Sequence, residues 1–182
     1  MMTTIAFLRA INITNHFVKM EDLRAVLVGQ GFENVQTYIQ SGNVVFADPT
    51  ISYPEAETLI NRQLEARLGF AVETFLRSAS ELVELEQACP FEPSEIDPKA
   101  ALYVTFVRHE PDAEAQARLA KHQNELDTFR ITGRHVWWLR HKQVGESKFS
   151  GAKLERALKQ AGTARNITTI RAMITKYGFT KA

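Results

Sequence analysis

Short apolar runs alternate with segments of helical spacing along the first half of the chain. Residues 4–8 are almost wholly apolar, which is typical of a central strand that is buried on both faces. Met20, Leu23 and Leu27 recur at intervals of three and four positions, which predicts an amphipathic helix. By the same criteria, further strands are predicted at 35–39, 44–47 and 71–76, with a helix around 56–64. The resulting order, βαββαβ, is a split βαβ pattern.

Capping and turn residues set the limits of these elements. Ser52 and Glu55 have the spacing of a capping box at a helix start. Gly31 and Gly69 each stand where a helical pattern stops, and glycine accepts the left-handed conformation that ends many helices. The sequence Ser-Gly-Asn at 41–43 predicts a short turn between the second and third strands.

The second half partly repeats this order. A proline-rich loop, with Pro90 at its start, places the expected boundary between residues 1–90, a βαββαβ half with a linking helix, and residues 91–182. Gly162 separates the last two predicted helices, and Asn166 is a natural N-cap for the second of them. The second half is therefore expected to be βαββαα. Its predicted strands are 101–107, 128–132 and 135–140, and its predicted helices are 112–122, 149–161 and 167–177.

Together these patterns predict an α+β protein of two ferredoxin-like (split βαβ) halves that form a two-part α/β sandwich. In a split βαβ half the first and second strands run parallel, so their carboxyl ends share one edge of the sheet. The loop after the first strand, from Arg9 to His16, is then expected beside the turn at 41–43. Loops at strand ends are where such scaffolds carry function.

Three stretches are together characteristic of a known family: Leu-Arg-Ala-Ile-Asn at 8–12, Thr-Tyr-Ile-Gln-Ser-Gly-Asn-Val-Val-Phe at 37–46, and Thr-Ala-Arg-Asn at 163–166. Gly-Glu-Ser-Lys at 145–148 is a weaker fourth. Over nearly its whole length the chain resembles the bacterial domain-of-unknown-function family sixteen ninety-seven. The resemblance implies a two-part α/β sandwich of about this length, and it implies no particular activity.

The chain departs from the pattern of that family at two points. A glycine pair is usual after Asn12, and Thr14-Asn15 stand there instead, which weakens the case for a first loop that wraps a phosphate with bare backbone. A tryptophan commonly follows the Arg-Asn pair, and here that residue is Ile167.

The formal net charge is only +1, but the charges are unevenly distributed. Residues 1–129 carry 10 Lys/Arg against 19 Asp/Glu, a net −9, whereas residues 130–182 carry 12 against 2, a net +10. One interpretation is that the basic third docks on the acidic part of the same chain or of a partner subunit. The other is that it forms an anion-binding face.

The first candidate site lies where the loop after the first predicted strand is expected to meet the turn at 41–43. Arginine offers a planar fork of donors, asparagine and serine add short hydrogen bonds, and glycine lets a backbone N–H approach a ligand, which together suit a phosphate or carboxylate. The alternative is that the asparagine and serine of the turn satisfy the turn itself and that the arginine pairs with an acid such as Asp22. The residues of this candidate site are Arg9, Asn12, Ser41, Gly42 and Asn43.

Two further candidate sites lie in the basic third. Arg165 and Asn166 stand at a helix start, where free N–H groups and the macrodipole attract anions; the alternatives are a structural ion pair and a plain N-cap. Lys148 belongs to a segment rich in lysine and arginine, and Trp137 and Trp138 lie in the same segment. An exposed tryptophan there would stack on a nucleobase, whereas two packed indoles would be structural.

Several other chemistries find no support. The phosphate-loop, dinucleotide-binding and nucleophile-elbow motifs are absent, and the histidines are poorly spaced for a metal, so we expect no cofactor and no metal site. Cys89 is the single cysteine, and a small hydrophobic role at a helix end accounts for it. The N-terminus does not have the pattern of a signal peptide and no apolar run is long enough to span a membrane, so we expect a cytoplasmic protein without a membrane partner.

The sequence therefore predicts an anion-binding protein that recognises nucleic acid or a phosphorylated ligand. One alternative is a small enzyme acting on a phosphate- or carboxylate-bearing metabolite, with Arg9, Asn43, Arg165 and Lys148 as substrate clamps. Another is a protein-interaction or self-assembly module. Whether the protein catalyses a reaction, and in which oligomeric state it works, is left open by the sequence.

Overall fold

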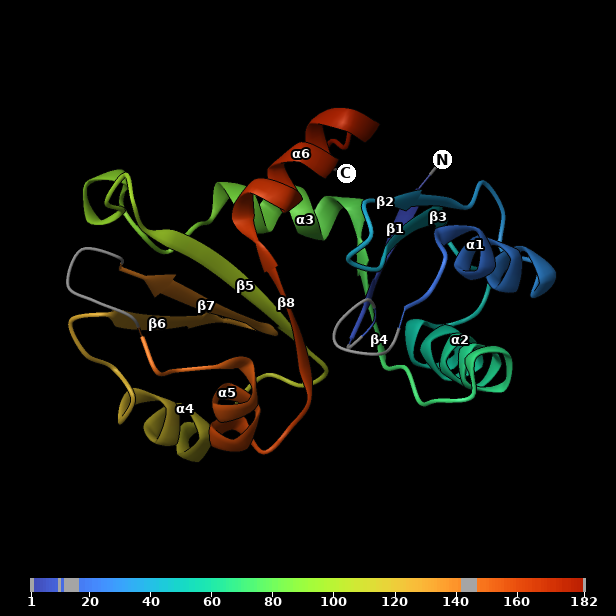
Figure 1. Cartoon of the computed structure of the whole chain (residues 1–182). Helices are drawn as coiled ribbons and strands as arrows, with labels where there is room; N and C mark the ends of the chain where they lie inside the picture. Colours follow the sequence, from blue (N-terminus) through green and yellow to red (C-terminus); the bar gives the residue numbers. More distant parts are fainter. Residues whose placement is uncertain (1, 10, 12–16, 142–146, 182) are drawn as a thin grey trace. The chain divides into compact units, whose positions relative to one another are not determined.

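The computed structural model describes residues 2–9, 11, 17–141 and 147–181. The chain divides into two compact units, the first comprising Met1–Glu84 with Lys176–Ala182 and the second Leu85–Thr175. Each unit contains one four-stranded antiparallel sheet with helices against it (Figure 1). No helix within the described ranges is long and apolar enough to cross a membrane.

The first unit has the order predicted for it. Its sheet has the strand order β2-β3-β1-β4, and α1 and α2 pack on one face of it (Figure 1). The chain then continues into α3 (Ala79–Gln87). The elements are β1 (Thr3–Leu8), α1 (Met20–Gly29), β2 (Gln36–Tyr38), β3 (Asn43–Ala47), α2 (Tyr53–Leu68) and β4 (Thr74–Ser78).

The predicted meeting of two strand ends at one sheet edge is confirmed. β3 runs antiparallel to both β1 and β2, so β1 and β2 share a direction with β3 between them. In this register Asn43 lies opposite both Phe7 and Tyr38. The backbone N–H of Leu8 donates to the carbonyl of Gly42 at 2.8 Å. The end of the first strand therefore lies directly beside the turn at 41–43.

The helix limits follow the capping residues. The carboxylate of Glu55 accepts from the backbone N–H of Ser52 at 3.0 Å and from its hydroxyl at 2.6 Å, and these bonds lower the pKa of Glu55. Gly69 ends α2 in the left-handed conformation with φ of 78°. Gly31 follows α1 with φ of 85°. The predicted start of one helix and stops of two are confirmed.

The second unit is a repeat of the same architecture. Its sheet has the strand order β6-β7-β5-β8, and α4 and α5 pack on one face of it (Figure 1). A short 3₁₀ turn, η1 (Pro93–Glu95), precedes the first strand. The elements are β5 (Ala101–Val107), α4 (Ala113–Ala120), β6 (Asp127–Thr132), β7 (His135–Arg140), α5 (Gly151–Leu158), β8 (Gly162–Asn166) and α6 (Ile167–Tyr177).

The expected order βαββαα for the second half is wrong at one element. Gly162–Asn166 forms the strand β8, which pairs antiparallel with β5 and places Arg165 opposite Val104. A helix break was predicted there because the segment has five residues and starts with glycine, so it lacks the run of large apolar side chains that marks a strand. The unit is thus βαββαβ followed by α6.

Gly162 allows β8 to pack closely on β5. A methyl group added at this position would lie 2.7 Å from Thr105 Cγ2 and 3.2 Å from the carbonyl oxygen of Phe106. Such contacts are closer than packed atoms tolerate, so a larger residue would displace the strand.

We expect Gly162→Ala to lower the free energy of unfolding by about 1–3 kcal/mol, because β8 must move to accept the methyl group. Gly151 of α5 is the matched control, since nothing lies within 4 Å of a methyl group added there. Gly151→Ala should be neutral or stabilise by up to about 1 kcal/mol. Urea denaturation followed by circular dichroism measures both; equal effects would contradict the packing of β8 on β5.

Candidate functional site

The turn at 41–43 is held together by its own side chains. Asn43 is fully buried, and its amide donates to the Tyr38 carbonyl at 3.0 Å and to the Ser41 hydroxyl at 2.9 Å. Gly42 has φ of 75°, and a methyl group there would lie 2.5 Å from Ile11 Cδ1. The glycine thus permits close approach of the chain after β1. These contacts favour the structural alternative for Ser41 and Asn43.

Arg9 joins the first strand to the fourth. Its backbone N–H donates to the Glu73 carbonyl at 2.8 Å, and its guanidinium lies 3.4 Å from the Glu73 carboxylate. Asp22, which the sequence suggested as a partner, pairs instead with Arg67 at 3.0 Å. Asn12, the remaining member of this candidate site, lies outside the described residues.

A buried arginine occupies the same position in both units. Arg165 is the fourth residue of β8, and Arg77 is the fourth residue of β4. Arg165 is 7% exposed and donates to the Thr163 hydroxyl at 2.7 Å and the Ala164 carbonyl at 2.9 Å. Burial lowers its pKa to about 10, so it stays charged at neutral pH. Arg77 is fully buried and donates to the Leu76 carbonyl at 2.7 Å.

Arg77 was missed by the sequence analysis. The signal that could have found it is the correspondence of the two units, because each arginine directly precedes the residue that caps the next helix. Ser78 accepts from the backbone N–H of Glu81 at 3.0 Å at the start of α3. Asn166 accepts from the N–H of Thr168 at 2.9 Å at the start of α6. Asn166 therefore has the N-cap role that the sequence offered as the alternative to anion binding.

Both tryptophans are buried, which supports the alternative that the two indoles are packed and structural. Trp137 is fully buried and Trp138 is 8% exposed. The Trp138 indole donates to one oxygen of the buried Asp127 at 2.7 Å, and the Ser147 hydroxyl donates to its other oxygen at 2.6 Å. The Asp127 carboxylate thereby fixes the segment that carries Lys148 to the sheet. The role of Asp127 was also missed.

A line of cations runs along α5 and the segment before it. Lys153, Arg156 and Lys159 follow at intervals of three, while Leu154 and its apolar neighbours face the core. Lys148 is exposed, and its carbonyl accepts from the Lys153 ammonium at 2.8 Å. Within the described ranges none of these cations forms an ion pair. We call Lys148, Lys153, Arg156 and Lys159 the basic face of α5.

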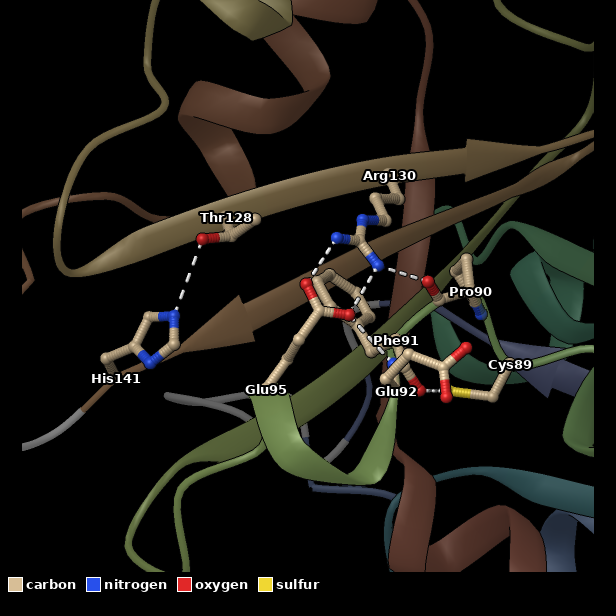
Figure 2. A network of polar contacts seen from close by, with 8 residues as sticks. All are labelled: Cys89, Pro90, Phe91, Glu92, Glu95, Thr128, Arg130 and His141. Carbon is tan, nitrogen blue, oxygen red and sulfur yellow. Dashed lines mark hydrogen bonds and ion pairs between the residues drawn. The ribbon is translucent and has the colours of Figure 1, made fainter.

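Arg130, another cation of the basic third, is engaged with the loop that begins the second unit (Figure 2). Its guanidinium donates to both carboxylate oxygens of Glu95, at 2.9 and 2.5 Å, and to the Pro90 carbonyl. It also lies 4.3 Å from the centre of the Phe91 ring. Cys89 sits in the same loop with its Sγ 3.7 Å from the Phe91 carbonyl. Arg130 therefore fastens this loop to β6.

The Arg130 hydrogen bonds hold the pKa of Glu95 below its usual range. Because the pKa is lowered on folding, the stabilisation is present above the unfolded-state pKa and is lost as the pH falls through the folded-state pKa. We expect Glu95→Gln to lower Tm by roughly 1–2 °C at neutral pH and to match the wild type in acid. Scanning calorimetry across pH checks this, with Glu125→Gln as an exposed control; a gap that persists in acid would contradict it.

Among the described residues, no group of three or more His, Cys, Asp or Glu side chains is placed to hold a metal ion. Within the second unit, Arg165 and Lys148 belong to different faces of the sheet. Arg165 lies in the row with Val104 and Trp137, whereas the chain around Lys148 packs with Trp138 on the face that α5 covers. The arginine and lysine predicted for a common clamp are therefore not brought together.

Comparison with known proteins supports the fold. The conserved bacterial protein SP0830 from Streptococcus pneumoniae is similar in structure, with a TM-score of 0.72 and 21% sequence identity over 97% of this chain and 98% of that chain. Comparison with curated proteins gives no significant match. The sequence model of the family described as protein of unknown function (DUF1697) matches residues 1–137. The chain therefore belongs to the DUF1697 family.

Proposed function

We propose that the protein binds a polyanion through the basic face of α5, and that this polyanion is nucleic acid. The observation that carries the proposal is that Lys153 and Arg156 within α5, Lys148 before it and Lys159 at its C-cap have no acidic ion-pair partner in the described part of the chain. Glu155 is the acid within α5, and its carboxylate accepts from the backbone N–H of Gly162 at 3.1 Å. This hydrogen bond directs it to the start of β8 and not to the cations. Unneutralised cations on one face attract phosphate groups.

The length of the basic face favours a chain of phosphates over a single one. Lys153 and Arg156 are three residues apart, which corresponds to about 4.5 Å along the axis of α5, and Lys159 follows at the C-cap of the helix. Lys148 extends the array beyond the N-terminal end of α5, where the helix macrodipole also favours negative charge. An extended row of cations matches the regular spacing of phosphates along a nucleic acid.

The burial of both indoles limits the kind of recognition that we propose. Without an exposed tryptophan for base stacking, the contacts that remain are those of lysine and arginine with phosphate. Such contacts position a protein on nucleic acid but do not specify sequence. The proposed binding is therefore non-specific and depends strongly on salt.

Four phosphate contacts predict a slope of about −3.6 for log K against log salt on duplex DNA, and hence about a hundredfold loss of affinity between 50 and 200 mM salt. Replacing Arg156 with glutamine should weaken binding to every sequence and reduce the slope by about 0.9. Fluorescence anisotropy with labelled duplex DNA and single-stranded RNA at several salt concentrations measures both quantities.

The variant with glutamine at Lys148, Lys153, Arg156 and Lys159 is expected to lose binding altogether. The control is Arg24→Gln with Arg62→Gln, which removes two exposed cations from α1 and α2 of the first unit. The proposal is rejected if the control and the α5 variants bind equally well, or if the affinity does not change with salt.

A further inference from the structure

The first unit contains a cavity that plays no part in the proposed function. It has a volume of about 310 Å³ and lies between the carboxyl end of α1 and the segment that leads from β3 to α2. This volume is within the range of small-molecule sites, which starts at about 300 Å³. The residues around it are Gln30, Gly31, Phe32, Glu33, Ala47, Asp48, Pro49, Thr50, Ile51 and Leu59.

Among the described residues that line this cavity, every charged side chain is an acid. These are Glu33 and Asp48, with no described lysine or arginine beside them. The carboxyl end of α1, capped by Gln30, also borders the cavity, and its last turn contains no basic residue. The negative end of the helix macrodipole adds to the charge of the two carboxylates. The cavity therefore favours a cation.

The carboxylate of Asp48 is held in place before any ligand arrives. Its Oδ1 accepts from the Thr4 hydroxyl at 2.6 Å and from the Tyr53 hydroxyl at 3.0 Å. Burial raises the pKa of Tyr53 to about 12, so this phenol keeps its proton at neutral pH. All side-chain hydrogen bonds of this carboxylate within the described residues fall on Oδ1, which leaves Oδ2 for a ligand.

Part of the remaining wall of the cavity is apolar. It is formed by the buried Phe32, by Ile51, which is 40% exposed, and by Pro49 and Leu59, while Gln30 and Thr50 add uncharged polar groups. An apolar body would remove this surface from water, in particular that of Ile51. The cavity thus combines a fixed carboxylate, a second carboxylate and an apolar wall.

We propose that this cavity binds a small organic cation, a primary amine carried on an apolar body. The ammonium group donates to Asp48 Oδ2 and is attracted by Glu33, while the body packs against Phe32, Ile51 and Leu59. The fixed position of Asp48 lowers the cost of ordering the site, and charge-assisted hydrogen bonds are the stronger kind. The inference rests on the first unit alone and is independent of the basic face of α5.

Isothermal titration of the full chain with 2-phenylethylammonium chloride tests the proposal, with 2-phenylethanol as the neutral analogue of the same shape. We expect saturable one-site binding of the amine and at least about tenfold weaker binding of the alcohol. Asp48→Asn should weaken amine binding about tenfold, because the amide oxygen still accepts from Thr4 and Tyr53 but the charge is gone. Glu33→Gln should weaken it about two- to fivefold, since Glu33 is exposed.

Glu21→Gln is the matched control, because Glu21 is exposed on α1 but does not line the cavity. It should leave the affinity for the amine unchanged. If Asp48→Asn fails to fold, Glu33→Lys replaces it, because it reverses a charge at an exposed position and should abolish amine binding. The proposal is overturned if the alcohol binds as tightly as the amine, if neither substitution weakens binding, or if no saturable heat appears up to about 10 mM amine.

Discussion

The antiparallel pairing of each unit's first strand with two neighbours is the constraint from which the rest of the structure follows. β1 lies between β3 and β4, and β5 lies between β7 and β8. Both first strands are buried on their two faces, so their polar backbone groups must be paired along both edges. The strand that follows the first helix therefore cannot pair with the first strand directly. It is displaced to the edge of the sheet, and the split βαβ order results.

The same constraint explains why most of the fold was predictable. A strand buried on both faces needs a continuous apolar run, and residues 4–8 and 101–107 display one. The helices are marked by their spacing and by local caps such as Ser52 with Glu55, which are three residues apart. β8 was missed because an edge strand pairs on one side only and contains small residues such as Gly162. β8 forms because the edge of β5 that does not face β7 needs a pairing strand. This requirement comes from the sheet and is not encoded in residues 162–166 themselves.

The candidate site was predictable only where partners are local. The Asn43–Ser41 contact joins residues two apart in the sequence. The sequence alone therefore suggested that the polar side chains of the turn hydrogen-bond within the turn. Arg9 with Glu73 and Arg130 with Glu95 join residues from separate elements, and no spacing rule connects them. The basic face of α5 did leave a signal, the cations at intervals of three from Lys153 to Lys159. That signal was missed because the candidate run of cations around the two tryptophans, from Arg130 to Lys153, ends before Arg156 and Lys159.

The uneven charge of the chain is explained in part by the different structural roles of its acidic and basic side chains. Acids of the first part serve the backbone: Glu55 and Glu81 accept from N–H groups at helix starts, and Glu57 accepts from the N–H of Leu76 at 2.8 Å. A carboxylate is suited to this work because the exposed donors of a helix start are N–H groups. Lysine and arginine cannot replace it, since they only donate. An acidic excess in a capped α+β unit is therefore partly a requirement of its helices and strands.

Among the described residues the side chains of Arg156 and Lys159 form no such structural contact, and this is why they bear on function. Arg77 and Arg165 show what structural arginines of this fold do: they are buried and donate to nearby carbonyl and hydroxyl groups. Arg156 is exposed within α5, where other polar residues would suit the helix equally well, and Lys159 is exposed at the C-cap. Four cations in and beside α5 repel one another, and no acid among the described residues pairs with them. A phosphate-bearing partner would relieve that repulsion, and the acidic cavity of the first unit would be relieved in the same way by an amine.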